Sequence, residues 1–403
     1  SRCRQRLVFV HVQAGPGAVD PIPDIEILRR LLERLGVPPD FQALTTRGDQ
    51  SLRFIHRRIG DTEVYFVANK NPYPEDALCS FRVSGRRPEF WWPDTGRIEA
   101  AVAYDESDGL TRVPIRFDPH GSVFVMFRAG ADFEPDRVTE ASRNGAPILT
   151  TASSVPDRTR TSLSAPAGVP PVALARTSGG GIAALISEPG AYRFERARGS
   201  AWRVEVGSLP EPVAILGPWE VRFAPNWGAP DRVVFDGLVS WSDHPEPGVN
   251  YFSGAATYST TFAVPSELIA SDHRLWLDLG RVAVIAEVKL NGKDLGILWK
   301  PPFTVEATDT VQPGDNVLEV KVVNLWINRQ IGDEFLPEDS ERNPDGTLKA
   351  WPQWLEEGRR SPTGRHTFTS WRLWRKTEPL AESGLLGPVR LRALKSVSPD
   401  PHR

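Results

Sequence analysis

The sequence predicts a mainly β protein of tandem β-sandwich domains that end in a jelly roll, with one short helix near the N-terminus. Three observations support this fold class. Short runs rich in β-branched and aromatic residues recur along most of the chain, separated by turn-forming residues. The 403 residues include 37 prolines, about twice the usual share, and this density favours turns and short strands over long helices. Only one segment has the period of an amphipathic helix.

The predicted helix lies within the first segment, residues 1–50. Apolar residues follow the i, i+3, i+4, i+7 spacing of one helix face at Ile25, Leu28, Leu31, Leu32 and Leu35. Asp24 is a suitable N-cap, and Gly36 followed by Pro38 and Pro39 ends the helix. Met126 is the only methionine, so the chain as given has no initiator; we expect either processing or a longer parent protein.

Residues 51–130 predict a β-sandwich domain. Runs such as EVYFVAN, CSFRVSG and SVFVMFR are separated by turn signals such as NKNPYP, PDTG and ESDG. Cys3 and Cys79 cannot form a disulfide framework, and Cys79 reads as a small buried strand residue. We interpret His56 as a strand histidine with a hydrogen bond rather than as part of an active site.

Residues 131–214 are rich in Pro, Ala, Ser and Thr and predict a linker or a thin β subdomain with long loops. The second interpretation is favoured because AALISEPGAYRFERARGSAWRVEV again has the pattern of strands.

Residues 215–397 contain about eight strand-like runs, which suit a jelly roll of two facing sheets. Asn291-Gly292 lies between two of them and predicts a type I′ hairpin turn. A long insertion at 325–384 separates the last two strands, and loops of this length are usually functional or disordered. Its five tryptophans argue against disorder: Trp326, Trp351, Trp354, Trp371 and Trp374.

Composition and motifs exclude several classes of protein. The net charge is −3 with no basic block, and no apolar run approaches the roughly 20 residues that span a bilayer, so we expect neither nucleic acid nor a membrane as partner. The nucleophile elbow, the HExxH zinc motif, the Walker loop and the dinucleotide fingerprint are all absent from the sequence.

One acidic loop, NRQIGDEFLPED, leaves three interpretations open. It contains Asp333, Glu334, Glu338 and Asp339. The loop is either solvated, or lines a sugar or calcium site, or supplies the two carboxyl groups that a glycosidase needs. Asp333 and Glu334 are weak calcium candidates, and no other cofactor is expected.

Two sets of motifs carry a resemblance to known families. NYFSGAATYSTTFAV and VAVIAEVKLNGKDLGIL resemble the galactose-binding-like, sugar-binding jelly roll of family 2 glycoside hydrolases. FRVSGRRPEFWWPDTGRIEAAVAYDESDG, NLWINRQIGDEFLPED and GRHTFTSWRLWRKTEPLAESGLLGPV resemble the C-terminal half of the α-L-rhamnosidases of glycoside hydrolase family 106. The similarity spans nearly the whole chain and is poorest at 131–190.

The resemblance implies an accessory, carbohydrate-binding region of an enzyme that degrades rhamnose-containing polysaccharide or glycoside. The catalytic glutamates would lie upstream on a barrel of the same polypeptide, and residues 1–50 would be the tail of that module. Alternatives are a structural module that only packs against the barrel, and a complete hydrolase that uses residues 333–339. The resemblance implies a bacterial source and leaves the location open between the periplasm and secretion as part of a longer precursor.

Sugar recognition needs flat aromatic faces and planar polar groups. Two loops offer both, and their candidate sugar-binding residues are Trp326, Asn328, Arg329, Asp333, Trp371 and Trp374 in one loop and Trp241, Asp243, His244 and Tyr251 in the other. The alternative is a purely structural role. In that case the loop tryptophans are buried, and Arg329 and Asp333 form a buried ion pair that ties the insertion to the sandwich.

Overall fold

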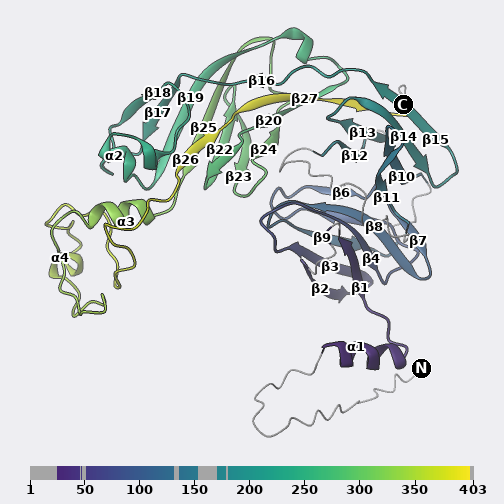
Figure 1. Ribbon diagram of the computed structural model, residues 1–403, viewed down its shortest axis with the longest axis horizontal. Coiled ribbons are helices and arrows are strands. Elements are labelled where there is room, and N and C mark those ends of the chain that lie inside the picture. Colours follow the sequence, from purple (N-terminus) through teal and green to yellow (C-terminus); the bar gives the residue numbers. More distant parts are fainter. Residues whose placement is uncertain are drawn as a thin grey trace, which may run out of the picture.

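The computed structural model describes residues 25–45, 47, 51–130, 136–152, 170–177 and 180–399 (Figure 1). The chain is mainly β, as predicted, with antiparallel sheets throughout the described ranges. None of the helices in these ranges combines the length and apolar character needed to cross a bilayer.

The first part of the chain is a sandwich of two sheets, with strand orders β1-β4-β8-β7 and β2-β3-β9-β5-β6. The strands are β1 (Phe41–Thr45), β2 (Leu52–Ile59), β3 (Thr62–Asn69), β4 (Glu75–Phe81), β5 (Pro88–Trp91), β6 (Ile98–Ala100), β7 (Asp105–Ser107), β8 (Leu110–Phe117) and β9 (Ser122–Phe127). Side chains alternate strictly between buried and half-buried along β4, because successive residues of a strand point to opposite faces. Cys79 is fully buried there, and the Nε2 of His56 donates a 2.9 Å hydrogen bond to the carboxylate of Glu63.

A second four-stranded sheet has the order β11-β10-β14-β15. Its strands are β10 (Val138–Arg143), β11 (Ala146–Thr150), β14 (Gly190–Arg196) and β15 (Ala201–Val206). Phe194 stacks on Trp202 with ring centroids 4.3 Å apart, and both rings belong to a core of their own. The segment of 131–214 that the structure describes is therefore rich in strands.

The largest sandwich is built on two six-stranded sheets. Its hydrophobic core lies between the first sheet and the part of the second sheet that contains β16, β20, β24 and β27, whereas β12 and β13 contribute to the core of Phe194 and Trp202. One sheet has the order β18-β17-β19-β25-β22-β23, and the other β12-β13-β27-β20-β24 with β16 paired to β27. The strands are β12 (Val172–Arg176), β13 (Ile182–Ile186), β16 (Val213–Ala214), β17 (Trp219–Phe223), β18 (Arg232–Phe235), β19 (Ala255–Val264), β20 (His273–Asp278), β22 (Ile285–Leu290), β23 (Lys293–Leu298), β24 (Thr304–Glu306), β25 (Gly314–Val323) and β27 (Arg390–Val397). A small ladder joins β21 (Arg281–Ala283) to β26 (Gly384–Gly387).

The Asn291-Gly292 turn between β22 and β23 has positive φ at both residues, 51° and 76°, as the predicted type I′ hairpin requires. The last strand, β27, pairs with β20 and β16 along most of its length and with β13 at its end. One strand thus connects the largest sandwich to the strands that precede it.

The predicted N-terminal helix is present as α1 (Ile25–Arg34). The proposed cap Asp24 lies outside the described residues, and Leu28, Leu32 and Leu35 on the apolar face are exposed. Short helical segments that the sequence did not predict are α2 (Pro247–Asn250), α3 (Ile327–Asp333), α4 (Gln353–Glu356), and the 3-10 turns η1 (Trp241–Asp243) and η2 (Ser266–Leu268).

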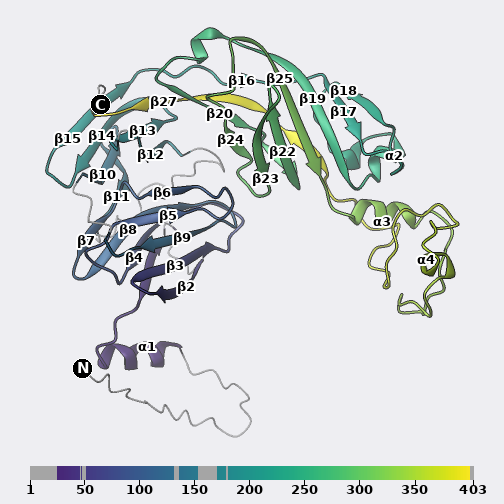
Figure 2. The ribbon, with the colours of Figure 1, turned by 180° about the vertical axis from the view of Figure 1, so that it is seen from behind.

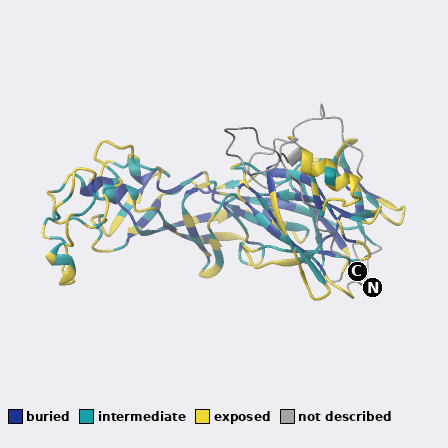
Figure 3. Cartoon of the chain, turned by 90° about the horizontal axis from the view of Figure 1, so that it is seen from below, coloured by how far each residue is buried: buried dark blue, intermediate teal, exposed yellow. Residues whose placement is uncertain are grey.

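The elements form an arch (Figure 1 and, from behind, Figure 2). The β1–β9 sandwich lies below one end, and the segment with α3 and α4 extends from the other end. Buried residues run through the sandwiches while the outer loops are exposed (Figure 3). Lys300, after β23, crosses to the first sandwich, where its Nζ lies 2.8 Å from Asp94 and 2.9 Å from Asp118.

Candidate functional site

Residues 325–384 connect β25 to β26 and are called the excursion here. Figures 1 and 2 place it beyond the end of the largest sandwich, with α3 next to the sandwich and α4 further out. Its outer part folds back on itself through isolated bridges between Arg342 and Leu348 and between Thr347 and Trp371.

Asn328 fastens the two ends of the excursion to each other. Its Nδ2 donates to the carbonyl oxygen of Ala381 and its Oδ1 accepts from the amide of Ala381, both at 2.8 Å. The side chain is only 1% exposed, and Nδ2 also lies 3.1 Å from the Oγ of Ser383. The amide group of Asn328 thus hydrogen-bonds within the protein and links the start of the excursion to its end.

Arg329 and Asp333 form a buried ion pair within α3, with Nε 3.0 Å from Oδ1. The second carboxylate oxygen of Asp333 accepts three more hydrogen bonds, from the amide of His366 at 2.9 Å and from the amide and hydroxyl of Thr367 at 2.7 Å each. The structure therefore favours the interpretation of a structural pair that ties the excursion together. Both oxygens of Asp333 have protein partners and the residue is only 1% exposed, so it does not face a ligand.

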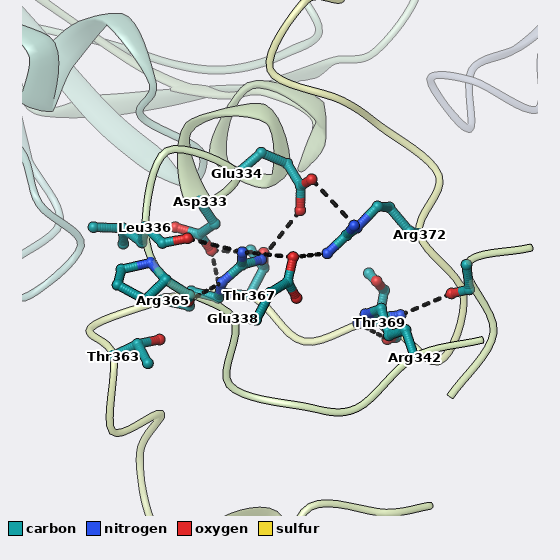
Figure 4. A network of polar contacts seen from close by, with 12 residues as sticks. Asp333, Glu334, Leu336, Glu338, Arg342, Thr363, Arg365, Thr367, Thr369 and Arg372 are labelled. Carbon is teal, nitrogen blue, oxygen red and sulfur yellow. Dashed lines mark hydrogen bonds and ion pairs between the residues drawn. The ribbon is translucent and has the colours of Figure 1, made fainter. Parts of the chain in front are cut away.

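Glu334 and Glu338 belong to an alternating network with two arginines (Figure 4). Glu334 lies 3.1 Å from Nη1 of Arg365 and 3.3 Å from Nε of Arg372. Glu338 contacts both guanidinium groups from the other side. Arg365 also donates to the carbonyl oxygens of Leu336 and Pro337. Each carboxylate is compensated by arginine, which favours a structural network over a catalytic pair facing an open cleft.

The same contacts bear on the weak calcium candidates. Calcium needs several free oxygen ligands. Both oxygens of Asp333 and both oxygens of Glu334 have partners in the protein. Across the described ranges, no group of three or more His, Cys, Asp or Glu residues is placed to hold a metal ion.

Aromatic rings gather around α3, and we call them the aromatic platform: Trp227, Tyr251, Trp326, Phe335 and His366. Trp227 packs edge-on against Trp326 at 5.4 Å and stacks with His366 at 6.1 Å. Tyr251 and Phe335 are 5.8 Å apart. Trp326 and Phe335 are more than half exposed, at 54% and 58%, so these two rings offer faces to solvent.

Arg329 lies next to both halves of the platform. Its guanidinium carbon is 6.0 Å from the ring centre of Tyr251, and a Cβ at Gly228 would lie 3.5 Å from Arg329 and 3.4 Å from His366. A Cβ at Gly332 would be 2.5 Å from the Nη2 of Arg329 and 2.7 Å from Tyr251, so only glycine lets α3 approach this closely. Burial lowers the pKa of His366, and the positive charge of Arg329 adds to this effect.

The second predicted loop is only partly near the platform. Tyr251 belongs to it, but Trp241 is completely buried and donates from Nε1 to the Tyr258 hydroxyl at 2.5 Å. This burial removes Trp241 from contact with any ligand. Asp243 is exposed, and His244 stacks on Phe235 with ring centres 5.0 Å apart. Burial lowers the pKa of His244.

Neither Trp371 nor Trp374 belongs to the platform: Trp371 lies in the outer part of the excursion, and Trp374 lines a recess next to α3. Trp371 is 56% exposed, and its Nε1 donates to the carbonyl oxygen of Asp345 at 3.1 Å. The recess of Trp374 is also lined by Glu334 and Arg365. The structure thus brings Trp326, Arg329 and Tyr251 together and separates them from these two tryptophans.

Sequence reasoning missed Trp227, Phe335 and His366. Trp227 gave a usable signal, because it lies in APNWGAP, where proline and glycine exclude a regular strand and leave a loop ring. Phe335 and His366 are ordinary apolar and polar loop residues in the sequence, and only the fold brings them to Tyr251 and Trp227.

Comparisons with known proteins indicate a glycoside hydrolase relationship. Residues 20–106 match the family model of the α-L-rhamnosidases of glycoside hydrolase family 106. The structure of a rhamnosidase from Novosphingobium sp. PP1Y matches 91% of this chain at 29% identity with a TM-score of 0.58. A putative β-glucuronidase from Formosa agariphila is 46% identical over 206 residues, or 51% of this chain.

The predicted resemblance to family 106 α-L-rhamnosidases is thereby confirmed. The chain spans 26% of the rhamnosidase and 18% of the putative β-glucuronidase, so it corresponds to a small part of each.

Proposed function

We propose that this chain is the accessory, carbohydrate-binding region of an α-L-rhamnosidase-like glycoside hydrolase that acts on rhamnose-containing polysaccharide or glycoside. In this proposal residues 215–397 are a galactose-binding-like jelly roll, residues 51–130 a separate sandwich domain, and a catalytic barrel of the same polypeptide precedes them. The catalytic carboxylates belong to that barrel.

The aromatic platform is the observation that carries the proposal. Trp326 and Phe335 expose flat apolar faces, which suit the C–H side of a pyranose. The buried contacts of Asn328, Arg329 and Asp333 hold α3 in place beneath them. A surface fixed in advance loses little conformational entropy when a ligand binds, and this favours a binding role.

Calorimetry of the 403-residue chain with rhamnose-containing oligosaccharides tests this proposal. Trp326→Ala should weaken binding about tenfold or more, because a central exposed ring typically contributes at least about 1.4 kcal/mol to affinity. Trp351→Ala is the matched control, since Trp351 is 60% exposed and packs on Phe368 in the outer excursion. Equal affinity of both variants and the unmodified chain would count against the platform.

A structural module that only packs against the barrel is the second candidate, and the large exposed apolar face of α1 favours it. It predicts neither heat nor a thermal shift with any oligosaccharide. A complete hydrolase that uses residues 333–339 would instead turn over an aryl rhamnoside and lose this activity in Glu334→Gln. We expect no turnover, because arginines compensate Glu334 and Glu338.

A further inference from the structure

The outer excursion contains a hollow of about 340 Å³ that is open to solvent. Two segments line it, residues 338–346 and residues 372–375. The side chains that line it include three arginines, Arg342, Arg372 and Arg375, and one carboxylate, Glu338. The lining side chains therefore carry an excess of positive charge, while Asp339, Glu341 and Asp345 of the same segments are outside the lining.

The ion pairs around the hollow leave two of these cations without a carboxylate partner. Glu338 is engaged by Arg372 and Arg365, and both of these arginines also pair with Glu334. Arg342 instead donates to carbonyl oxygens, of Gly346 at 3.0 Å and of Thr369 at 2.7 Å (Figure 4). Arg375 is exposed and makes no ion pair or side-chain hydrogen bond within the described ranges.

Three buried polar atoms of the lining have no hydrogen-bond partner among the described residues: the Nε of Arg342, the Oγ of Ser340 and the Nε of Arg372. Of these, the Nε of Arg372 still has an ion pair with Glu334 at 3.3 Å. Unpaired buried polar atoms are rare in folded proteins and cost free energy. The Nε of arginine can only donate, so the partner that would satisfy it is an acceptor.

The electrostatics of Arg342 indicate the same kind of partner. Burial lowers the pKa of its guanidinium, and the neighbouring Arg365 lowers it further, while Asp339 and Glu334 oppose this effect. An anion in the hollow would relieve both unfavourable contributions.

We propose that the hollow binds an oxyanion carried by a carbohydrate, either the carboxylate of a uronic acid or a sulfate ester. This inference rests on the proposed carbohydrate-binding function and specifies the chemical class of the ligand. Guanidinium groups form paired hydrogen bonds with planar oxyanions, whereas sugar hydroxyls can satisfy a donor but cannot compensate a charge. The acidic unit would lie against Arg342 and Arg375, away from the platform at Trp326.

Calorimetry of the full 403-residue chain tests the inference with three ligands: a rhamnose-only oligosaccharide, one that also contains glucuronate, and one that contains sulfated rhamnose. We expect at least one acidic ligand to bind about tenfold or more tightly than the neutral one. This advantage should shrink in high salt, which screens a solvent-open site. The preferred acidic ligand identifies the oxyanion as carboxylate or sulfate.

Arg375→Gln should abolish the advantage, and it should fold normally because Arg375 is exposed and unpaired in the described structure. Arg203→Gln on β15 removes the same charge from an exposed position in another sheet and should keep the advantage. Equal binding of neutral and acidic ligands, or an advantage that survives Arg375→Gln, overturns the inference. If the neutral oligosaccharide binds and Trp326→Ala abolishes this binding, the proposed carbohydrate-binding function is supported even where the oxyanion inference fails. If no ligand binds, both the proposed function and the oxyanion inference are wrong.

Discussion

Replacement of Asp333 by alanine tests how the excursion is held in place. Asp333 is 1% exposed and accepts four hydrogen bonds, one from Arg329, one from His366 and two from Thr367. Its removal leaves the guanidinium of Arg329 buried without a counter-charge and three further donors without an acceptor. Removal of one partner from a buried ion pair typically costs about 3–5 kcal/mol.

This cost should appear as local opening of the excursion rather than as loss of the sandwiches. The hydrogen-bond partners of Asp333 in the described structure, Arg329, His366 and Thr367, all belong to the excursion, whereas the largest sandwich has its own core of buried strands. About 3–5 kcal/mol raises the open population by roughly 10² to 10³·⁵, since each 1.4 kcal/mol is a factor of ten. Hydrogen exchange should therefore show faster exchange of amides in 327–336 and 366–368, with little change in β19 and β25.

Glu341→Ala is the matched control, because Glu341 is a highly exposed acid of the same excursion that lies 3.6 Å from Lys349. An exposed pair of this kind contributes little, so exchange in α3 should not change. If the amides of α3 in Asp333→Ala exchanged as slowly as in the unmodified chain, the Arg329–Asp333 ion pair would not be the contact that holds the excursion. Another contact would then have to hold the platform in place.

Two further predictions concern charge at other positions. Lys300→Met should destabilise the chain by about 1–3 kcal/mol in urea unfolding, less than a fully buried pair because Asp118 is partly exposed. Burial lowers the pKa of Lys300, but Asp118 and Asp94 outweigh this effect and raise the pKa. The ion pair therefore stabilises the fold fully below the unfolded pKa of about 10.4, and this stabilisation disappears only as the pH rises above that value. The loss of stability in Lys300→Met should thus be constant from pH 6 to 9. The pKa of His366 is lowered, mainly by burial, so the unfolded chain takes up a proton at this position below about pH 6.5 while the folded chain does not. Thermal unfolding at pH 7.5 and 5.5 should show a smaller acid-induced drop in His366→Gln, and an identical drop would contradict the assignment.

Most of the local structure could be predicted from the sequence, because it depends on neighbouring residues. Alternation along β4 and the Asn291-Gly292 turn are set by the two-residue period of a strand and by backbone φ. The short helix α3 was not predicted, since seven residues carry too little periodicity and its stability comes from tertiary partners such as Ala381 and Thr367.

The candidate site was harder to predict, because its residues come from distant segments. Trp241 lies in the polar run SWSDH, which suggested exposure, yet its ring packs between Phe223 and Phe252. The partners of Glu334, Arg365 and Arg372, follow about thirty to forty residues later without any regular spacing. Exposure and pairing of this kind are decided by the path of the chain, which the pattern of residue types does not specify.

The final strand has a consequence for how this molecule comes apart. β27 contributes Leu391 and Ala393 to the core of the largest sandwich, and Val397 at its end packs against the preceding core. Neither core is complete until β27 is in place, although all the other strands of the described ranges precede it. The two cores are therefore both completed when β27 docks, and dissociation of β27 would expose both cores at once.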